Sequence, residues 1–223
     1  MTSKKNIVIA IDGPSASGKS STARLVAREL GFVYVDTGAM YRTLAWHCLK
    51  LGLDIHDAKA VANACRRWKS RLATQTEDKL AQVRLLVDEH FPAAEIRTAE
   101  TSAAVPHVAA VPKVRDWMKR SQRSCQEFGN LVMEGRDIGT NVFPETDFKY
   151  FLDARLEERT RRRQADGVNE DLAKRDKRDS DRPVAPLMVP LGAVRVDNSH
   201  MTLDQTVAFI VADVRRRIPE LAG

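Results

Sequence analysis

Short runs of mainly apolar residues alternate along this chain with longer stretches of helical pattern. They cover residues 7–11, 32–35, 131–133, 148–152 and 194–196, and the first of them is continuous. Short apolar runs of this kind are typical of strands buried on both faces of a parallel sheet. The first run ends at Asp12 and is only five residues long, so we interpret it as a buried strand and not as a signal peptide.

Helical patterns fill the intervals between these runs. We predict helices over residues 19–30, 39–51, 57–68, 112–128, 156–164 and 170–179, and a last helix that begins at Thr202. Gly31 is expected to end the first helix, and Asp57 and Thr202 are expected to act as N-caps. Strands that alternate with helices indicate an α/β fold, with a five-stranded parallel sheet covered by helices on both faces.

Two stretches have a weaker pattern. Residues 74–96 show no clear periodicity, and only residues 85–87 resemble a strand. Residues 101–111 are rich in alanine and are interrupted by Pro106. Because the sequence contains no internal repeat, linker or low-complexity tract, we predict a single domain over residues 1–223.

A glycine-rich loop directly follows the first predicted strand. Residues 13–20 read GPSASGKS and match the pattern G-x-x-x-x-G-K-[ST]. In such a loop the glycines let successive N–H groups turn inward, and the helix that follows adds the positive end of its dipole. Lys19 is then placed to reach the β- and γ-phosphates of a nucleotide, and the Ser20 hydroxyl can ligate Mg²⁺. The strand and helix on either side make a chance match improbable.

The net charge of +6 has two interpretations, a polynucleotide partner or a pocket for anionic small molecules. The most basic stretch, residues 155–182, holds ten Lys or Arg but also eight Asp or Glu. A nucleic-acid-binding arm would lack those acids, so we expect no nucleic acid as partner. No apolar run reaches the roughly 18–20 residues of a membrane span. The scattered Cys48, Cys65 and Cys125 form no metal or redox spacing and suggest a reducing, cytoplasmic location.

A phosphate loop alone does not separate kinases from switches, motors or translocases. The chain is small for the larger machines, and it has no Asn-Lys-x-Asp segment of the kind that a GTP switch uses to recognise its base. Small-substrate kinases therefore remain as the favoured class.

Several segments together resemble the bacterial cytidylate kinases, in the same order and over nearly the whole chain. They are VDTGAMYR (35–42), EIRT (95–98), VAAVPKVR (108–115), EGRDIGTNVFP (134–144), FLDA (151–154), KRDKRDSDRPVAPL (174–187) and VDNSHMTLDQTV (196–207). The resemblance implies a three-layer P-loop NTPase fold and an ATP-dependent, Mg²⁺-assisted kinase that phosphorylates CMP and dCMP. It further implies a core at residues 1–37, 105–155 and 183–223, an inserted nucleoside-monophosphate-binding region at about 38–104 and a short lid at about 156–182. We also expect a monomer.

The same resemblance assigns roles to individual residues. ATP would be bound by the phosphate loop: Gly13, Pro14, Ser15, Ala16, Ser17, Gly18, Lys19, Ser20 and Ser21. CMP would be bound by Thr37, Arg42, Arg115, Arg136, Asp137, Arg175, Asp179 and Arg182, with Asp137 and Arg182 recognising the cytosine and Asp179 orienting the sugar through Arg175. The catalytic residues would be Lys19, Arg136, Arg159, Arg162 and Arg175, and Arg163 would join Arg159 and Arg162 in the lid. Thr37 has a second interpretation, as the cap of the next helix.

Elementary chemistry supports these roles. Cytosine presents an amino donor where uracil presents a carbonyl acceptor, so a carboxylate such as Asp137 accepts from the first and repels the second. Arginine gives planar, bidentate contacts to phosphate. An acceptor phosphate is already ionised near neutral pH, so the reaction requires no general base, and the absence of a histidine cluster is no objection.

Three features depart from the family pattern. Pro106 stands where the family often carries a hydroxyl residue that helps to bind the base, and proline has no side-chain donor or acceptor. The segment between Arg163 and Arg175 is shorter than the usual lid, and Ser20-Ser21 replaces the more frequent Gly-Thr. Pro106 leaves open a P-loop kinase for another acceptor, such as UMP or a small alcohol. The net charge leaves open a nucleotide-dependent module that binds nucleic acid.

Overall fold

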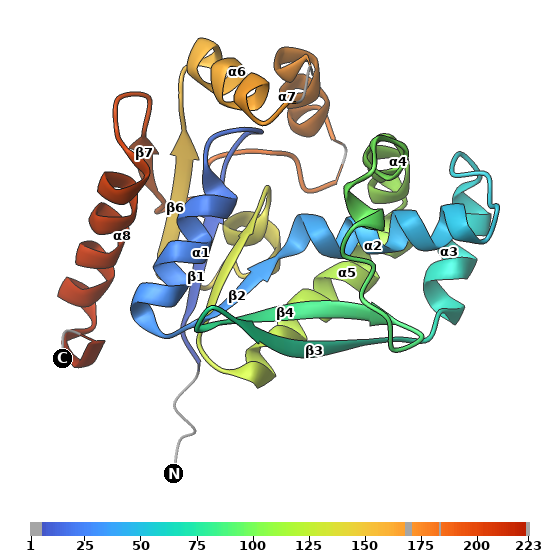
Figure 1. Ribbon diagram of the computed structural model, residues 1–223, viewed down its shortest axis with the longest axis horizontal. Coiled ribbons are helices and arrows are strands. Elements are labelled where there is room, and N and C mark those ends of the chain that lie inside the picture. Colours follow the sequence, from blue (N-terminus) through green and yellow to red (C-terminus); the bar gives the residue numbers. More distant parts are fainter. Residues whose placement is uncertain (1–5, 168–170, 183, 222–223) are drawn as a thin grey trace.

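A seven-stranded sheet forms the centre of the computed structural model, which describes residues 6–167, 171–182 and 184–221 (Figure 1). The predicted helix start at residue 170 and the predicted core boundary at residue 183 lie outside the described residues. The strand order is β3-β4-β2-β5-β1-β6-β7. The strands are β1 (Val8–Asp12), β2 (Val33–Asp36), β3 (Ser70–Glu77), β4 (Leu80–Val87), β5 (Leu131–Gly135), β6 (Phe148–Asp153) and β7 (Val194–Asp197).

The five predicted strands are confirmed as β1, β2, β5, β6 and β7, and all the pairs among them are parallel. The prediction of a five-stranded, wholly parallel sheet was wrong, because the hairpin of β3 and β4 adds two strands. In this hairpin β3 runs antiparallel to β4, which pairs in parallel with β2 at Tyr34 and Gln82.

The hairpin was not predicted, although residues 85–87, which resembled a strand in the sequence, form the end of β4. Its sequence lacks a typical hairpin turn and a continuous apolar run in β3. Its two-residue turn consists of Asp78 and Lys79, at φ 47° and 63°, where a turn with two positive φ angles usually holds Asn-Gly or Asp-Gly. Strand β3 lies at the edge of the sheet, and its side chains are exposed or only half-buried. An edge strand of this kind has no continuous apolar run to mark it.

Eight α-helices are found among the described residues; seven of them lie where helices were predicted, and α4 was not predicted. They are α1 (Lys19–Leu30), α2 (Thr37–Lys50), α3 (Ala58–Arg67), α4 (Ala99–Ala110), α5 (Pro112–Ser124), α6 (Leu156–Ala165), α7 (Leu172–Ser180) and α8 (Leu203–Arg217). Gly31 ends α1 in the left-handed conformation, and Asp57 and Thr202 cap α3 and α8 as predicted. Helix α2 begins two residues earlier than predicted, and its cap is Asp36, so the interpretation of Thr37 as the cap was wrong.

Helix α4 continues through Pro106, which the sequence pattern presented as an interruption. Proline removes one hydrogen bond from a helix and strains the preceding turn. Ala104 and Val108, on either side of it, are buried in the main hydrophobic core, and this packing holds the helix together.

Helices cover both faces of the sheet and enclose two hydrophobic cores. On β1, Ile9 and Ile11 face the core that contains α1 and α8, while Val8 and Ala10 face the core that contains α2, α4 and α5. The three-layer arrangement predicted for the fold is therefore confirmed. In Figure 1, α8 and α1 lie at the end of the sheet formed by β6 and β7, and α2, α3 and α4 lie towards the other end.

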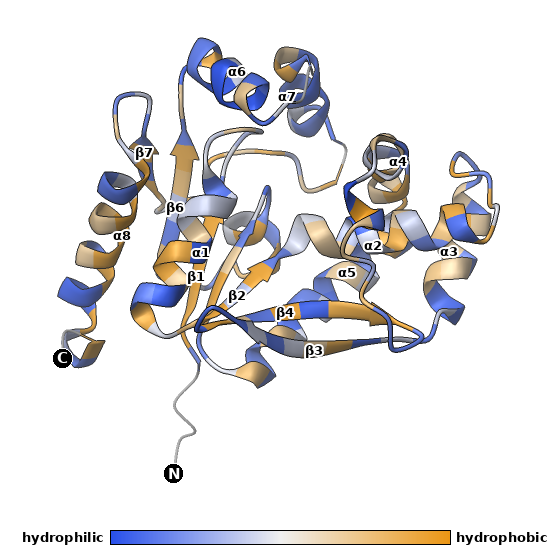
Figure 2. Ribbon diagram, in the orientation of Figure 1, coloured by the Kyte–Doolittle hydropathy of each residue, from blue (hydrophilic) through white to orange (hydrophobic). Residues whose placement is uncertain are grey.

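The carboxyl ends of the parallel strands meet along one edge of the sheet. Strand β1 runs from there into residues 13–18, β2 into α2, β5 into a π-helical turn (Ile138–Val142) and β6 into α6. Helices α6 and α7 lie beyond this edge (Figure 1). Figure 2 shows that they are mostly hydrophilic, whereas β1 and β6 are mostly hydrophobic. A ligand site is expected at such an edge in an open α/β sheet.

Two further properties of the fold bear on the sequence predictions. No helix within the described residues is long and apolar enough to span a membrane. The three cysteines are buried and free, in agreement with the absence of a redox or metal spacing.

Replacing Thr202 with alanine should destabilise the fold without altering the site. Thr202 accepts a hydrogen bond from Gln205 N, and Gln205 Oε1 accepts one from Thr202 N, which forms a reciprocal cap on α8. Loss of such a cap costs about 1 kcal/mol. Chemical denaturation of Thr202→Ala should show this loss, whereas Thr202→Ser should keep most of the stability. Equal stability of the two variants would contradict the role of the hydroxyl.

Candidate active site

The loop of residues 13–18 joins β1 to α1 in the conformation that an anion-binding nest requires. Gly13, Ala16 and Gly18 have φ angles of 152°, 58° and 84°. A side chain on Gly13 would lie 2.0 Å from Leu152 O, so no other residue fits between this loop and β6. The N–H groups at the start of α1 and the dipole of the helix favour negative charge here.

Lys19 is buried and lies folded over this loop. Its Nζ donates to Pro14 O at 2.5 Å and contacts Ser17 Oγ at 3.4 Å. Burial and next the positive charge of Arg136, against the opposing effect of Glu134, lower the pKa of Lys19 to about 7. A buried cation in this position is stabilised by any polyanion that enters the loop.

Ser20 and Glu134 provide oxygen atoms next to Lys19. The Ser20 hydroxyl donates to Glu134 Oε1 at 2.5 Å, and Tyr34 contacts the same oxygen at 3.3 Å. Burial, and next the charge of Asp36, raise the pKa of the Glu134 carboxyl. A hydroxyl beside a buried carboxylate fits Mg²⁺, which prefers oxygen ligands and keeps several of its waters. Within the described part of the chain no group of three or more His, Cys, Asp or Glu side chains is arranged to hold a metal alone.

Asp12, at the end of β1, holds the turn that follows β5. Its carboxylate is fully buried and accepts from Ile138 N at 2.9 Å and from Gly139 N at 2.7 Å. Burial raises the pKa of Asp12 to about 7, although these two hydrogen bonds lower it. Asp12 therefore connects the start of the phosphate loop to the turn that begins after Asp137.

Thr37 packs against the end of β5 at the same edge. Its hydroxyl donates to Glu134 O at 2.7 Å, and the side chain is buried. A side chain on Gly135 would approach Thr37 Oγ1 and Ile138 Cδ1 to 2.7 Å, so this close contact of α2 with β5 requires glycine. The Thr37 hydroxyl consequently lies next to the residues of the EGRD segment.

Arginine–carboxylate pairs surround the space beyond these strand ends. Asp36 accepts from Arg42 at 3.0 Å, and Asp137 accepts from Arg115 at 2.8 Å. Asp179, on α7, accepts from Arg136 Nε at 3.0 Å and is also paired with Arg182. Burial lowers the pKa of the Arg182 guanidinium, and the charges of Arg115 and Arg136 act in the same direction. The pairs leave the site with more cations than anions.

Arg115, on α5, lies over the ring of Tyr41, on α2. Arg115 is buried, and its Nε has no hydrogen-bond partner among the described residues. Its guanidinium lies 5.8 Å from the centre of the Tyr41 ring. Burial raises the pKa of Tyr41 to about 12, and the nearby charges of Arg115 and Asp137 oppose each other in this effect. An unpaired, buried donor next to an aromatic ring suits a planar polar ligand.

Helix α6 is attached to the phosphate loop by two arginines. Arg159 donates to Ala154 O at 2.9 Å and to Ser15 O at 3.2 Å. Arg162 donates to Asn198 Oδ1 at 3.0 Å and to Asn198 O at 2.9 Å, and Asn198 Nδ2 in turn donates to Ser17 O at 2.9 Å.

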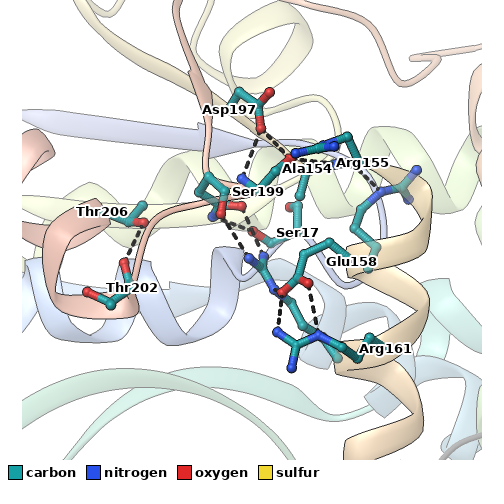
Figure 3. A network of polar contacts seen from close by, with 12 residues as sticks. Ser17, Ala154, Arg155, Glu158, Arg161, Asp197, Ser199, Thr202 and Thr206 are labelled. Atoms are coloured by element: carbon teal, nitrogen blue, oxygen red, sulfur yellow. Dashed lines mark hydrogen bonds and ion pairs between the residues drawn. The ribbon is translucent and has the colours of Figure 1, made fainter.

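Figure 3 shows the polar contacts around this attachment. Arg155 N donates to Ser199 Oγ at 2.8 Å, and the Ser199 hydroxyl donates to Asp197. On α6, Glu158 accepts from Arg161, and it also accepts from Arg162 at 2.8 Å. The start of α6, the end of β7 and the phosphate loop are thus joined by one set of hydrogen bonds.

The structure brings the predicted site residues to one edge of the sheet. The phosphate loop, Thr37, Arg136 and Asp137 lie at the strand ends, Arg42 and Arg115 come from α2 and α5, and Arg159, Arg162, Arg175 and Asp179 come from α6 and α7. Arg175 is close enough to Lys19 to lower the pKa of that lysine. The roles assigned to these residues remain predictions.

Sequence reasoning missed five residues that the geometry places in the site: Asp12, Tyr41, Glu134, Asp176 and Asn198. Four of them stand inside quoted segments, and Asp12 directly precedes the phosphate loop. The sequence analysis therefore covered these positions without assigning a role to them. Their contacts join segments that are far apart in the sequence, and no local pattern predicts those contacts.

Comparison with known proteins places this geometry in a family. The sequence profile described as "Cytidylate kinase" matches residues 9–216. A cytidylate kinase of Geobacillus thermodenitrificans is 39% identical over 96% of this chain and 99% of its own length. One of Limosilactobacillus reuteri is 41% identical over 98% of this chain and 99% of its own length.

A longer relative contains the same unit. In a bifunctional pantoate ligase/cytidylate kinase of Trichormus variabilis, the match is 38% identical and covers 96% of this chain but 42% of that protein. The matched length, the phosphate loop and the paired arginines at the strand ends agree, and the chain belongs to the cytidylate kinase family.

Proposed function

We propose that this protein transfers the γ-phosphate of ATP to CMP and dCMP and releases ADP with CDP or dCDP. One observation carries the proposal: the lysine of a phosphate loop and a set of paired arginines lie side by side at one sheet edge. Arg136 and Arg175 are both near enough to act on the charge of Lys19. The two phosphate groups that react can then lie between the loop and these arginines.

The donor triphosphate binds in the phosphate loop. Its β- and γ-phosphates lie over the start of α1, where Lys19 exchanges its contact with Pro14 O for phosphate oxygens. Ser20 and Glu134 are the residues that would hold Mg²⁺ or its waters. When it is bound, Mg²⁺ neutralises charge on the β- and γ-phosphates.

The acceptor lies between Arg42, Arg115, Arg136 and Asp179. Asp137 is held by Arg115 and by Asn141, which donates to it at 3.0 Å, so its carboxylate has a fixed position for the amino group of cytosine. Arg136 and Arg182, both fixed by Asp179, take the acceptor phosphate and the base edge. A buried site of this kind discriminates strongly, since the wrong base leaves its polar groups unpaired.

Phosphoryl transfer here needs positioning and charge, not a base. The bond from the γ-phosphorus to the bridging oxygen of ATP breaks, and a bond to an oxygen of the acceptor phosphate forms. Because that oxygen is already ionised, no residue has to remove a proton. Lys19, Arg136 and the lid arginines Arg159, Arg162 and Arg175 stabilise the charge that passes between the nucleotides.

We further propose the division into a core, an insert at about 38–104 and a lid at about 156–182, and a monomer that works in the cytoplasm without a nucleic-acid partner. Pro106, on α4, is half-buried and lies two residues beyond the proposed insert, in the core segment that begins at residue 105. The position of Pro106 favours the one alternative worth testing, a changed preference between CMP and UMP.

A panel of acceptors tests the proposed function directly. We expect ADP release with Mg²⁺-ATP to be fast with CMP and dCMP, and far slower with UMP, AMP, GMP or no acceptor. Lys19→Ala should lower the rate by about 10²-fold or more, because it removes charge from the transition state. Lys59→Ala, at an exposed position on α3, is the control. ADP release that does not depend on any acceptor would overturn the proposal.

Asp137→Asn should narrow the preference for CMP over UMP by about 10- to 100-fold in kcat/KM, since an amide can also donate to the carbonyl of uracil. Asp116→Asn removes the same charge at an exposed position of α5 and should leave the preference unchanged. If Asp137→Asn kept the full preference, Asp137 would not take part in recognition of the base.

ATP binding at pH 8 should be accompanied by proton uptake. The pKa of Lys19 in the free protein is about 7, so the side chain is mostly neutral at pH 8, and the entering triphosphate raises its pKa and recharges it. Calorimetry in two buffers with different ionisation enthalpies should give an uptake approaching one proton per ATP. Lys19→Arg should take up almost none, because arginine is already charged. The same uptake in both proteins would exclude Lys19 as its source.

A further inference from the structure

A carboxylate from α7 lies against the phosphate loop. Asp176 Oδ1 accepts a hydrogen bond from Ser15 N at 3.3 Å, and the other oxygen of the carboxylate is paired with Arg159. Arg159 also donates to Ser15 O at 3.2 Å, so the loop, the arginine and the carboxylate form a closed set of contacts. Ser15 and Arg159 are buried, and the Asp176 side chain is mostly so.

These contacts use the groups that a donor triphosphate would also use. Backbone N–H groups of a phosphate loop bind oxyanions, and a carboxylate has the same acceptor chemistry as a phosphate oxygen. Arg159 is one of the lid arginines expected to face the phosphates. A carboxylate next to an incoming triphosphate is repelled by it, and the repulsion is strong in a buried site. The triphosphate and Asp176 therefore compete for Ser15 N and for Arg159.

Helix α7 extends this competition to the acceptor site. Asp176 and Asp179 are three residues apart, so they lie on the same side of the helix. Asp179 holds Arg136 and Arg182, which border the acceptor site. One short helix thus carries a carboxylate at the donor site and another at the acceptor site. Movement of Asp176 away from the loop would shift the helix that positions Arg136 and Arg182.

We propose that Asp176 is a built-in competitor of the donor triphosphate. In the free protein it holds Ser15 N and Arg159, and ATP has to displace it to bind. Its carboxylate lowers the affinity for ATP and links occupation of the donor site to the position of Asp179. This inference rests on the proposed function, because it takes the ligand of the loop to be a nucleoside triphosphate.

Direct binding of a non-hydrolysable ATP analogue, with Mg²⁺ and without acceptor, tests the proposal. We expect Asp176→Asn to bind the β,γ-imido analogue about 3- to 10-fold more tightly than the unaltered protein in calorimetry. AMP, which has no β- or γ-phosphate, should bind equally to both. Asp166→Asn, which removes the same charge at an exposed position on the C-terminal side of α6, should leave both affinities unchanged. Asp176→Ala serves as a second variant should the amide alter the packing.

Hydrogen exchange supplies a readout that does not depend on affinity. In the free Asp176→Asn protein the amides of α7 should exchange faster, and the analogue should produce the same change in the unaltered protein. Weaker or unchanged analogue binding by both Asp176 variants would overturn the proposal and would make Asp176 a residue that positions Arg159. If the unaltered protein bound no analogue at all, the proposed function would fail, and the two failures are distinguishable.

Discussion

Buried positive charge is the constraint on which the site of this protein depends. A site for two phosphorylated nucleotides needs many cations in one place, and an unpaired cation away from water is costly. The free protein meets this cost with carboxylates. Asp137 pairs with Arg115, Asp176 with Arg159, and Asp179 with both Arg136 and Arg182. Each carboxylate holds its arginine in position and offsets its charge in the free protein.

The charge of Lys19 is not offset by a paired carboxylate. It has no close carboxylate partner among its hydrogen bonds, which go to Pro14 O and Ser17 Oγ. Burial and Arg136 lower its pKa instead, so part of the cost is met by loss of the proton. For Asp12 the cost is that of a buried negative charge. It is lowered by protonation, since burial raises the pKa of this carboxyl to about 7. The interior of the site thus limits its charge both by pairing and by protonation.

The sequence predicted most of the frame and the location of the site. The apolar runs identified five of the six strands that have parallel neighbours, and the glycine-rich loop after the first of them indicated the position of the phosphate site. Strand β3 was missed, and β4 was anticipated only at residues 85–87, because an edge hairpin with an Asp-Lys turn gives no strong local signal. The quoted segments also contained Glu134, Asp176 and Asn198, but in all three cases the role depends on a contact across more than one hundred residues. Such contacts follow from how strands and helices meet, and periodicity along the chain does not contain that information.

The hydrogen bonds of α7 explain why this helix next to the site contains both basic and acidic residues. Asp176 and Asp179 each hold an arginine, and a segment of arginines alone would repel itself in the free protein. Asp176 lies at the donor loop, and Asp179 lies one turn away at the acceptor site. When a phosphate takes over the arginine that a carboxylate has held, the helix loses one of its two attachments and keeps the other. The same charges that stabilise the free protein thereby make the position of α7 depend on which of the two sites is filled.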